Sequence, residues 1–278
     1  MEKYLLVDGS NLLFQMFYGM PARIPGPDGR PIQGTLGFVG ALLKMIRMVK
    51  PTHVGVFFDG ECENPRKALD EDYKANRPDW SEIPEEELPF SQLPDIYAAL
   101  DCLGICHRET DCCETDDWMA SYARALEGET VLASFDSDYF QLLSDRLSVL
   151  RYRGKESRLW TPQTLKEKLG VAPEHYAWFK AMTGDSSDNV PGIPGVGPKT
   201  AAALTAQFST MEEMLANTQA IVRPAIRKAV EANRDRLLKS YALIRLEGME
   251  PLPFAPEQLR WQYQGQTTMA VLAAIGLG

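Results

Sequence analysis

Nine acidic residues stand at points where the sequence changes from one expected element to the next, and their chemistry is that of cation ligands. They are Asp8, Asp59, Glu114, Asp116, Asp117, Asp136, Asp138, Asp185 and Asp188. A single aspartate after a strand is usually turn chemistry, and an acid in the first turn of a helix usually offsets the helix dipole. Nine carboxylates that converge on one place would repel one another strongly unless cations lay between them.

The ligand type indicates which cation. Carboxylate oxygens favour Mg²⁺, with Mn²⁺ as a substitute, and the chain has only three histidines that could provide the nitrogen ligands typical of zinc. Two such ions about 3.5–4 Å apart can activate a water and stabilise the leaving oxygen of a phosphodiester. No Ser–His or Cys–His arrangement offers a competing nucleophile. The acids therefore predict metal-dependent phosphodiester hydrolysis.

Strands and helices alternate in the part of the chain that must position most of these acids. Apolar runs at residues 4–7, 54–58 and 130–135 are predicted strands, and aspartates follow each of them. Helices are expected over 36–49, 93–103 and 114–126. This alternation predicts an α/β fold with a central, mostly parallel twisted sheet flanked by helices. Ligands of such sheets bind beyond the carboxyl ends of the strands, where the acids are expected.

Beyond residue 160 the strand-like runs stop and the sequence is typical of helices to its end. We therefore expect an α/β domain over 1–160 and a helical region over 161–278.

Residues 184–208 begin with the last two acids, continue as a Pro/Gly hairpin and end in a helix. Pro198 suits the first helical position, where its missing N–H group costs nothing. The backbone N–H groups around Gly192, Gly195 and Gly197 would lie at the positive end of the helix dipole, which favours a phosphate. Lys199 adds a positive charge, and Thr200 adds a hydroxyl.

Three interpretations of this hairpin compete. A nucleotide-binding P-loop is rejected because Pro198 displaces Lys199 by one position and a helix-like segment precedes the glycines. A tight interhelical turn without a ligand is the simplest alternative. A helix–hairpin–helix that grips the nucleic-acid backbone without reading its sequence is favoured by Asp185 and Asp188, for which a bare turn has no need.

Size and cysteine content limit the class of protein. The chain has 278 residues and 45% hydrophobic content, enough for one large core or two smaller ones. Its apolar runs are too short to span a membrane, and its start has no signal-peptide pattern. Four of the five cysteines cluster at residues 102–113 without the spacing of a zinc knuckle. We therefore expect reduced thiols and a cytoplasmic location.

The net charge of −9 argues at first against a nucleic-acid partner. Without the nine candidate ligands, however, 29 of the 38 acidic residues remain, which equals the 29 lysines and arginines. Bound divalent cations would offset the rest. The charge therefore does not exclude DNA, but it predicts that DNA contacts come from local patches.

Five motifs, in order along nearly the whole chain, resemble those of the 5′-nuclease (flap endonuclease) family. They are VDGSN at 7–11, FFDG at 57–60, ETDD at 114–117, FDSDYFQLLSD at 135–145 and GDSSDNVPGIPGVGPKTA at 184–201. The set is most similar to the N-terminal 5′→3′ exonuclease domain of bacterial DNA polymerase I. The resemblance implies a resolvase-like (PIN-like) sheet and a helix–hairpin–helix variant. It also implies 5′→3′ exonuclease and flap endonuclease activity in DNA replication or repair.

The resemblance further divides the acids between two metal ions. It implies one ion held by Asp8, Asp59, Glu114 and Asp116, and a second held by Asp136, Asp138 and Asp188, with Asp117 and Asp185 adjoining. It implies K⁺ at the hairpin, bound by backbone carbonyls. The implied partners are DNA with a 5′ flap or 5′ end, including duplex and single strand, and RNA primer ends. A monomer at the bacterial nucleoid, without membrane contact, is expected.

The resemblance also implies a helical arch near residues 64–95 that threads or clamps the 5′ single strand. The match begins at Asn64 and continues to residue 77, and it implies that Lys74 and Arg77 approach the scissile phosphate. Arg66 would contact DNA, and Tyr73 would stack on a base. Taken alone, the sequence at 74–77 is typical of a solvated surface. The acidic run at 81–87 is unlike a basic DNA clamp, so threading of flaps and binding of duplex ends both stay open.

Two other functions compete with this one. A metal-dependent ribonuclease on a related sheet would have no evident need of a duplex clamp. A binding protein without catalysis would have no reason to keep nine mutually repelling carboxylates. Because the last residue, Gly278, lies near the expected end of a nuclease domain, we expect no attached polymerase.

Overall fold

The computed structural model describes residues 2–20, 22–61, 65–77, 80 and 82–278, without the side chain of Glu86. Asn64 and Ser81, which belong to the expected arch and acidic run, lie outside the described residues. The strands are β1 (Lys3–Asp8), β2 (His53–Phe58), β3 (Cys106–Glu109), β4 (Glu129–Ala133), β5 (Leu147–Arg151) and β6 (Arg158–Trp160). The helices are α1 (Gly9–Gly19), α2 (Gln33–Val49), α3 (Pro65–Leu69), α4 (Leu93–Leu103), α5 (Thr115–Ala125), α6 (Pro162–Leu169), α7 (Tyr176–Thr183), α8 (Pro198–Gln207), α9 (Met211–Ala216), α10 (Pro224–Ala232), α11 (Arg234–Ile244) and α12 (Thr268–Ala274).

The strands form one sheet in the order β3-β2-β1-β4-β5-β6. All neighbouring strands are parallel except β5 and β6, so the predicted α/β fold with a mostly parallel sheet is confirmed. The chain starts at the centre of the sheet and builds outward in both directions, which makes the space between the ends of β1 and β4 the switch point of the topology. Ligands of open α/β sheets bind at such a point.

Side chains of β1 alternate between two cores, as the pleat of a strand requires. Leu5 and Val7 pack with residues of α2 and α4, whereas Leu6 packs with residues of α5. Both faces of the strand are therefore buried, which explains its continuous apolar sequence. The carboxylate that follows is held at the end of a rigid element.

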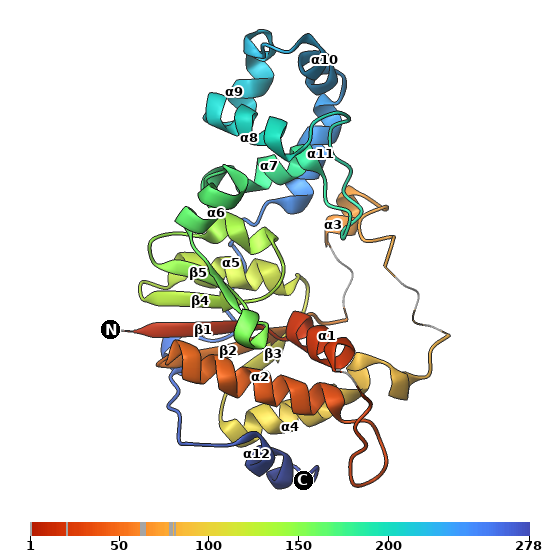
Figure 1. The fold of residues 1–278 in the computed structure, drawn as a ribbon, viewed down its shortest axis with the longest axis vertical. Coiled ribbons are helices and arrows are strands. Elements are labelled where there is room, and N and C mark those ends of the chain that lie inside the picture. Colours follow the sequence, from red (N-terminus) through yellow and green to blue (C-terminus); the bar gives the residue numbers. More distant parts are fainter. Residues whose placement is uncertain (1, 21, 62–64, 78–79, 81) are drawn as a thin grey trace.

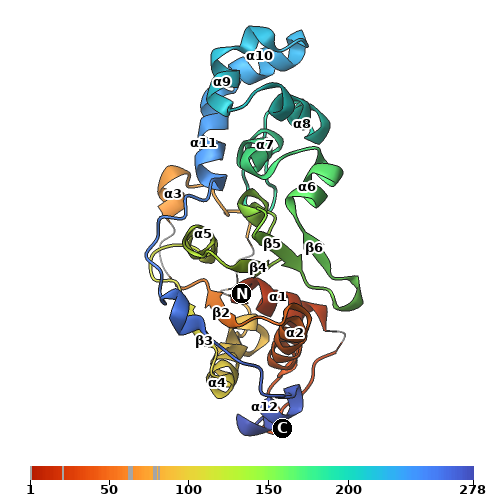
Figure 2. The same cartoon turned by 90° about the vertical axis from the view of Figure 1, so that its left-hand side faces the viewer.

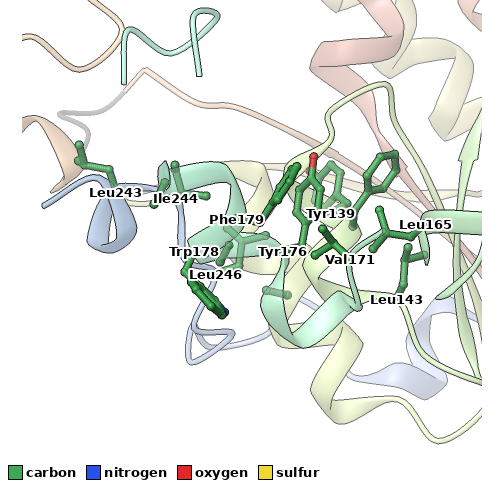
Figure 3. Packing of buried hydrophobic residues seen from close by; sticks show 14 of the residues in the cluster. Tyr139, Leu143, Leu165, Val171, Tyr176, Trp178, Phe179, Leu243, Ile244 and Leu246 are labelled. Atoms are coloured by element: carbon green, nitrogen blue, oxygen red, sulfur yellow. The ribbon is translucent and has the colours of Figure 1, made fainter. Parts of the chain in front are cut away.

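The helical part shares its core with the sheet. Figure 1 shows α6 to α11 stacked above the strands, and Figure 3 shows the apolar side chains that join the two parts. Tyr139 and Leu143 follow β4, and they belong to one buried cluster with Tyr176 and Phe179 of α7 and Leu243 of α11. Because this core is continuous, the loops after β4 and after α7 keep a fixed relation to each other.

The end of the chain returns to the sheet. A short 3₁₀ helix, Pro256–Leu259, packs against β2, and α12 packs against α2 and α4 (Figure 2). The division of the chain at residue 160 remains a prediction. No helix among the described residues is long and apolar enough to cross a membrane.

The described residues of the expected arch form no long helix. They contain α3, the two 3₁₀ helices Glu85–Glu87 and Pro89–Gln92, and the first three residues of α4. Pro65 and Pro89 begin α3 and the second 3₁₀ helix, and Pro84 directly precedes the first 3₁₀ helix. Among the described residues, no helix continues across these prolines, since an interior proline removes a hydrogen bond and clashes with the preceding turn. In both views α3 lies beside α11 (Figures 1 and 2).

Candidate active site

Asp8 ends β1 and caps α1. Its carboxylate accepts hydrogen bonds from the backbone N–H of Asn11 at 2.9 Å, the Ser134 hydroxyl at 3.0 Å and the Tyr139 hydroxyl at 3.2 Å. Asn11 also accepts a bond from the backbone N–H of Phe135 through its side chain. These bonds tie the ends of β1 and β4 together and hold the buried Asp8 carboxylate at the switch point.

The start of α5 brings three further acids to the same edge. Glu114 is the N-cap, and its N–H donates to the Asp117 carboxylate, which closes a capping box. The Asp59 carboxylate, directly after β2, accepts a bond from the N–H of Thr115 at 2.9 Å. The helix dipole favours negative charge at this position, so the fold tolerates Asp116 beside the other acids.

Aspartates in the loop after β4 stabilise the turn of that loop. Asp136 accepts a hydrogen bond from the backbone N–H of Asp138 at 2.8 Å, so its side chain stabilises the turn that buries Asp138. Carboxylate oxygens of Asp138, Asp185 and Asp188 all lie within 4.8 Å of one another. Three oxygen donors so close together suit a hard divalent cation. In the described part of the chain, no other three His, Cys, Asp or Glu side chains approach one another as closely.

Cationic side chains lie among the acids at the start of α5. Arg66 forms ion pairs with Glu114, with Asp116 at 3.1 Å and with Asp117 at 2.7 Å. Only 8% of Arg66 is exposed, so in this conformation the guanidinium faces the acids and not solvent. Its contact with DNA stays a prediction.

Lys74 and Tyr73 connect the acids at the start of α5 with the group formed by Asp138, Asp185 and Asp188. The Lys74 ammonium pairs with Glu114 and lies 3.9 Å from Asp188. The Tyr73 hydroxyl donates to Glu114 at 3.1 Å, and its oxygen lies 3.4 Å from the Asp188 carboxylate. Tyr73 is 3% exposed, so in this conformation its side chain is buried beside the acids, and its stacking on a base stays a prediction. Arg77 is exposed and lies 3.7 Å from Asp188, at the rim of the site.

Sequence reasoning missed Lys180. This lysine interrupts the apolar helix α7, is 7% exposed, and pairs with Asp138 and with Asp185 at 2.6 Å. A lysine within an otherwise apolar helix was the available signal, because a buried ammonium needs a partner.

Burial and like charge shape the titration of the acids. Burial, aided by the charge of Asp59, raises the pKa of Asp8 to about 7. Burial also raises the pKa of Asp138 to about 7, although Lys180 acts in the opposite direction. For Glu114, the cations Lys74 and Arg66 outweigh burial and hold the pKa at about 2. A divalent cation beside Asp8 would offset the cost of burying its charge and favour the ionised form of the carboxylate.

We expect the metal-free protein to lose stability relative to an Asp8→Asn variant as the pH rises from 5 to 7. In this window folded Asp8 keeps a proton that the unfolded chain has lost, because its pKa rises to about 7 on folding. The free energy of unfolding then falls with pH by at most about 1.4 kcal/mol per unit. Urea unfolding in EDTA at both pH values measures the effect. Equal changes in the two proteins would show that Asp8 ionises normally.

A cavity of about 450 Å³ opens beside these acids. Acidic residues of the sheet edge and of α5 line one part of it, and aromatic residues line another. The aromatic part is Phe14, Trp80 and Phe90, and the rings of Phe14 and Phe90 meet edge to face with centroids 5.3 Å apart. Lys74 and Arg77 also contribute. The cavity thus combines negative charge, two cations and apolar surface, and its volume is that of a small-ligand site.

The hairpin between α7 and α8 starts with Asp185 and Asp188, the two aspartates that lie close to Asp138. Asp185 and Val190 exchange backbone hydrogen bonds of 2.7 and 2.8 Å at its base. A Cβ on Gly192 would lie 2.5 Å from the backbone of Thr183, so no larger residue fits there. Gly195 has a positive φ of 82°, which favours glycine. The tip is anchored by the buried Val196, whereas Gly195, Gly197 and Lys199 are exposed and Thr200 is half-buried.

Comparison with known proteins yields two family matches. The 5'-3' exonuclease N-terminal resolvase-like domain matches residues 3–170, and the 5'-3' exonuclease C-terminal SAM fold matches residues 171–267. DNA polymerase I of Rhizobium leguminosarum is 38% identical over 261 residues, which cover 90% of this chain and 25% of that protein. Thermostable DNA polymerase I of Thermus filiformis is 35% identical over 262 residues, which cover 93% of this chain and 30% of that protein. The chain thus spans between a quarter and a third of these relatives.

Solved structures share the fold. The T5 D15 protein, co-crystallised with metal ions, gives a TM-score of 0.72 at 21% identity and covers 88% of this chain and 90% of its own. The T5 D15 flap endonuclease, in a pseudo-enzyme-product complex with DNA and metal ions, gives 0.71 at 21% identity and covers 88% and 89%. Human GEN1 in complex with Holliday junction DNA gives 0.61 at 17% identity and covers 98% and 66%.

Proposed function

The chain belongs to the 5'-3' exonuclease family, and on this premise we propose that it is a divalent-metal-dependent 5′→3′ exonuclease and 5′-flap endonuclease. It hydrolyses DNA phosphodiesters in replication or repair. The observation that carries this proposal is the convergence of acids from the ends of β1, β2 and β4, from α5 and from the hairpin at one sheet edge. The relatives are DNA polymerases, and the T5 D15 flap endonuclease was crystallised with DNA and metal ions, which supports DNA as the substrate.

The donor chemistry supports Mg²⁺, with Mn²⁺ as a substitute. We assign one ion to Asp8, Asp59, Glu114 and Asp116, and the second to Asp136, Asp138 and Asp188, with Asp117 and Asp185 adjoining. Two such ions, when bound, activate water and stabilise the leaving oxygen. The close approach of Asp138, Asp185 and Asp188 supports the second assignment.

The chain's own residues perform the remaining tasks. Hydroxyl groups of Ser134 and Tyr139 orient Asp8. Lys74 and Arg77 bring positive charge to the cavity where the scissile phosphate approaches, and such charge is most effective on the charge that develops in the transition state. Phe14, nearby in the cavity, offers a ring on which an unpaired base can stack.

The hairpin is assigned to duplex DNA. Its exposed tip presents Gly195, Gly197 and Lys199 together at the start of α8, an arrangement that suits a phosphate. Gly192 and Thr200 belong to the same contact, and backbone carbonyls of the hairpin hold K⁺. The protein acts as a monomer at the bacterial nucleoid in the cytoplasm, on 5′ flaps, 5′ ends and RNA primer ends.

Lys199→Ala should weaken binding of all duplex sequences about equally. Loss of one phosphate contact lowers the slope of log affinity against log salt by roughly one unit. Fluorescence anisotropy of a labelled duplex at several salt concentrations measures this slope, and Lys155→Ala, which changes an exposed lysine after β5, is the control. An unchanged slope would assign Lys199 to solvent and leave the hairpin a structural turn.

A panel of substrates tests the function. The protein is incubated with a 5′-flap DNA duplex, a matched RNA flap and single-stranded RNA, with and without Mg²⁺. Mg²⁺-dependent cleavage that favours the DNA flap is expected. Preference for single-stranded RNA would indicate a ribonuclease instead. Binding of the flap without cleavage of any substrate would indicate a binding protein without catalysis.

A further inference from the structure

Lys180 is a buried cation inside the group formed by Asp138, Asp185 and Asp188, and the proposed mechanism gives it no task. Its ammonium contacts Asp138 and lies 2.6 Å from the Asp185 carboxylate. These are two of the three carboxylates that approach one another closely enough to share an ion. The ammonium therefore occupies part of the space that the second cation would need.

Packing alone does not explain a lysine at this position. Residues Tyr176 to Met182 of α7 are all buried, and the helix packs against α8 and α11. An apolar side chain of similar length would fill the same space without the cost of taking a charge out of water. The useful property of Lys180 is thus its charge, which the two aspartates require when no metal is bound.

We propose that Lys180 is a built-in counter-ion that competes with the second divalent cation for Asp138 and Asp185. A cation that enters this group must either displace the ammonium or bind beside it, and both cost electrostatic energy. Lys180 therefore stabilises the metal-free protein and weakens the second cation site, so that the free protein holds one ion more tightly than the other. The identity of the ions rests on the proposed function.

The test measures Mn²⁺ binding to the whole protein without DNA, by titration with EPR detection of free Mn²⁺. Lys180→Met removes the charge and keeps the length of the side chain. We expect its weaker Mn²⁺ site to tighten about tenfold or more relative to the unmodified protein. Lys239→Met is the matched control, because Lys239 is half exposed and pairs with Asp70 at 2.8 Å, outside the cluster. This control should leave both Mn²⁺ constants unchanged.

Two further measurements separate the charge from packing. Lys180→Arg keeps the charge and should keep the weak Mn²⁺ site. Lys180→Met should melt at a lower temperature than the unmodified protein in EDTA, and Mn²⁺ should narrow this difference. If Lys180→Met does not fold, Lys180→Gln takes its place with the same expected result.

Unchanged or weaker Mn²⁺ binding in the folded neutral variant would overturn the proposal, as would tighter binding in Lys180→Arg. The Mn²⁺ titration uses no DNA and does not depend on cleavage. Cleavage of flap DNA by the unmodified protein is therefore a separate test of the proposed function.

Discussion

Replacing Asp138 by asparagine will reduce Mg²⁺-dependent cleavage of 5′-flap DNA by at least about a hundredfold. The amide keeps the shape of the side chain but removes a negative charge from the group that the buried Asp138 and Asp185 form with the half-buried Asp188. The second cation is then held less tightly. Single-turnover cleavage rates in Mg²⁺ measure the loss, and Asp145→Asn, an exposed change in the same loop, is the control.

Metal-free binding of DNA distinguishes this effect from damage to the fold. With one carboxylate fewer near the phosphate backbone, the affinity of the Asp138→Asn variant in EDTA should hold or rise. Filter binding or anisotropy measures it. A proportional loss of binding and cleavage, or normal cleavage, would refute the assignment of Asp138 to the second ion.

Lys74→Ala will slow single-turnover cleavage by about 10²–10³-fold while weakening DNA binding less than about tenfold. The ammonium lies in the cavity between Glu114 and Asp188, where it can act on charge that develops in the transition state. Quench-flow rates at saturating enzyme, with separate binding curves, separate the two quantities.

Lys155→Ala serves as the control, since Lys155 is an exposed lysine after β5, outside the segment 64–95 that is expected to contact DNA. Equal losses of cleavage and binding in Lys74→Ala would reduce Lys74 to a binding contact.

Local sequence patterns were sufficient for the fold class, whereas the site residues that they indicate stay a prediction. Continuous apolar runs before Asp8 and Asp59 predicted buried parallel strands, and parallel strands deliver the residues that follow them to one edge. The family matches confirm the resemblance drawn from the motifs. The assignment of each acid to one of two ions stays a prediction.

Pairings across long sequence separations could not be predicted in this way. Arg66 pairs with acids 48 to 51 positions away, and Lys180 pairs with Asp138 at a separation of 42. These partners depend on how segments pack, not on any local spacing. The resemblance indicated DNA contacts for Arg66 and Tyr73, whereas the fold buries both residues against the acids. Motif similarity identifies such residues but does not show what they contact without DNA.

The central claim is that the acids at the sheet edge act through divalent cations to cut DNA. It is tested most directly by adding Mg²⁺ to metal-stripped protein that is already bound to a 5′-labelled flap duplex. We predict no product in EDTA, and product release whose rate rises more steeply than the first power of Mg²⁺ concentration at low concentrations. Cleavage in EDTA, or an intact flap at saturating Mg²⁺ with the DNA still bound, would contradict the claim.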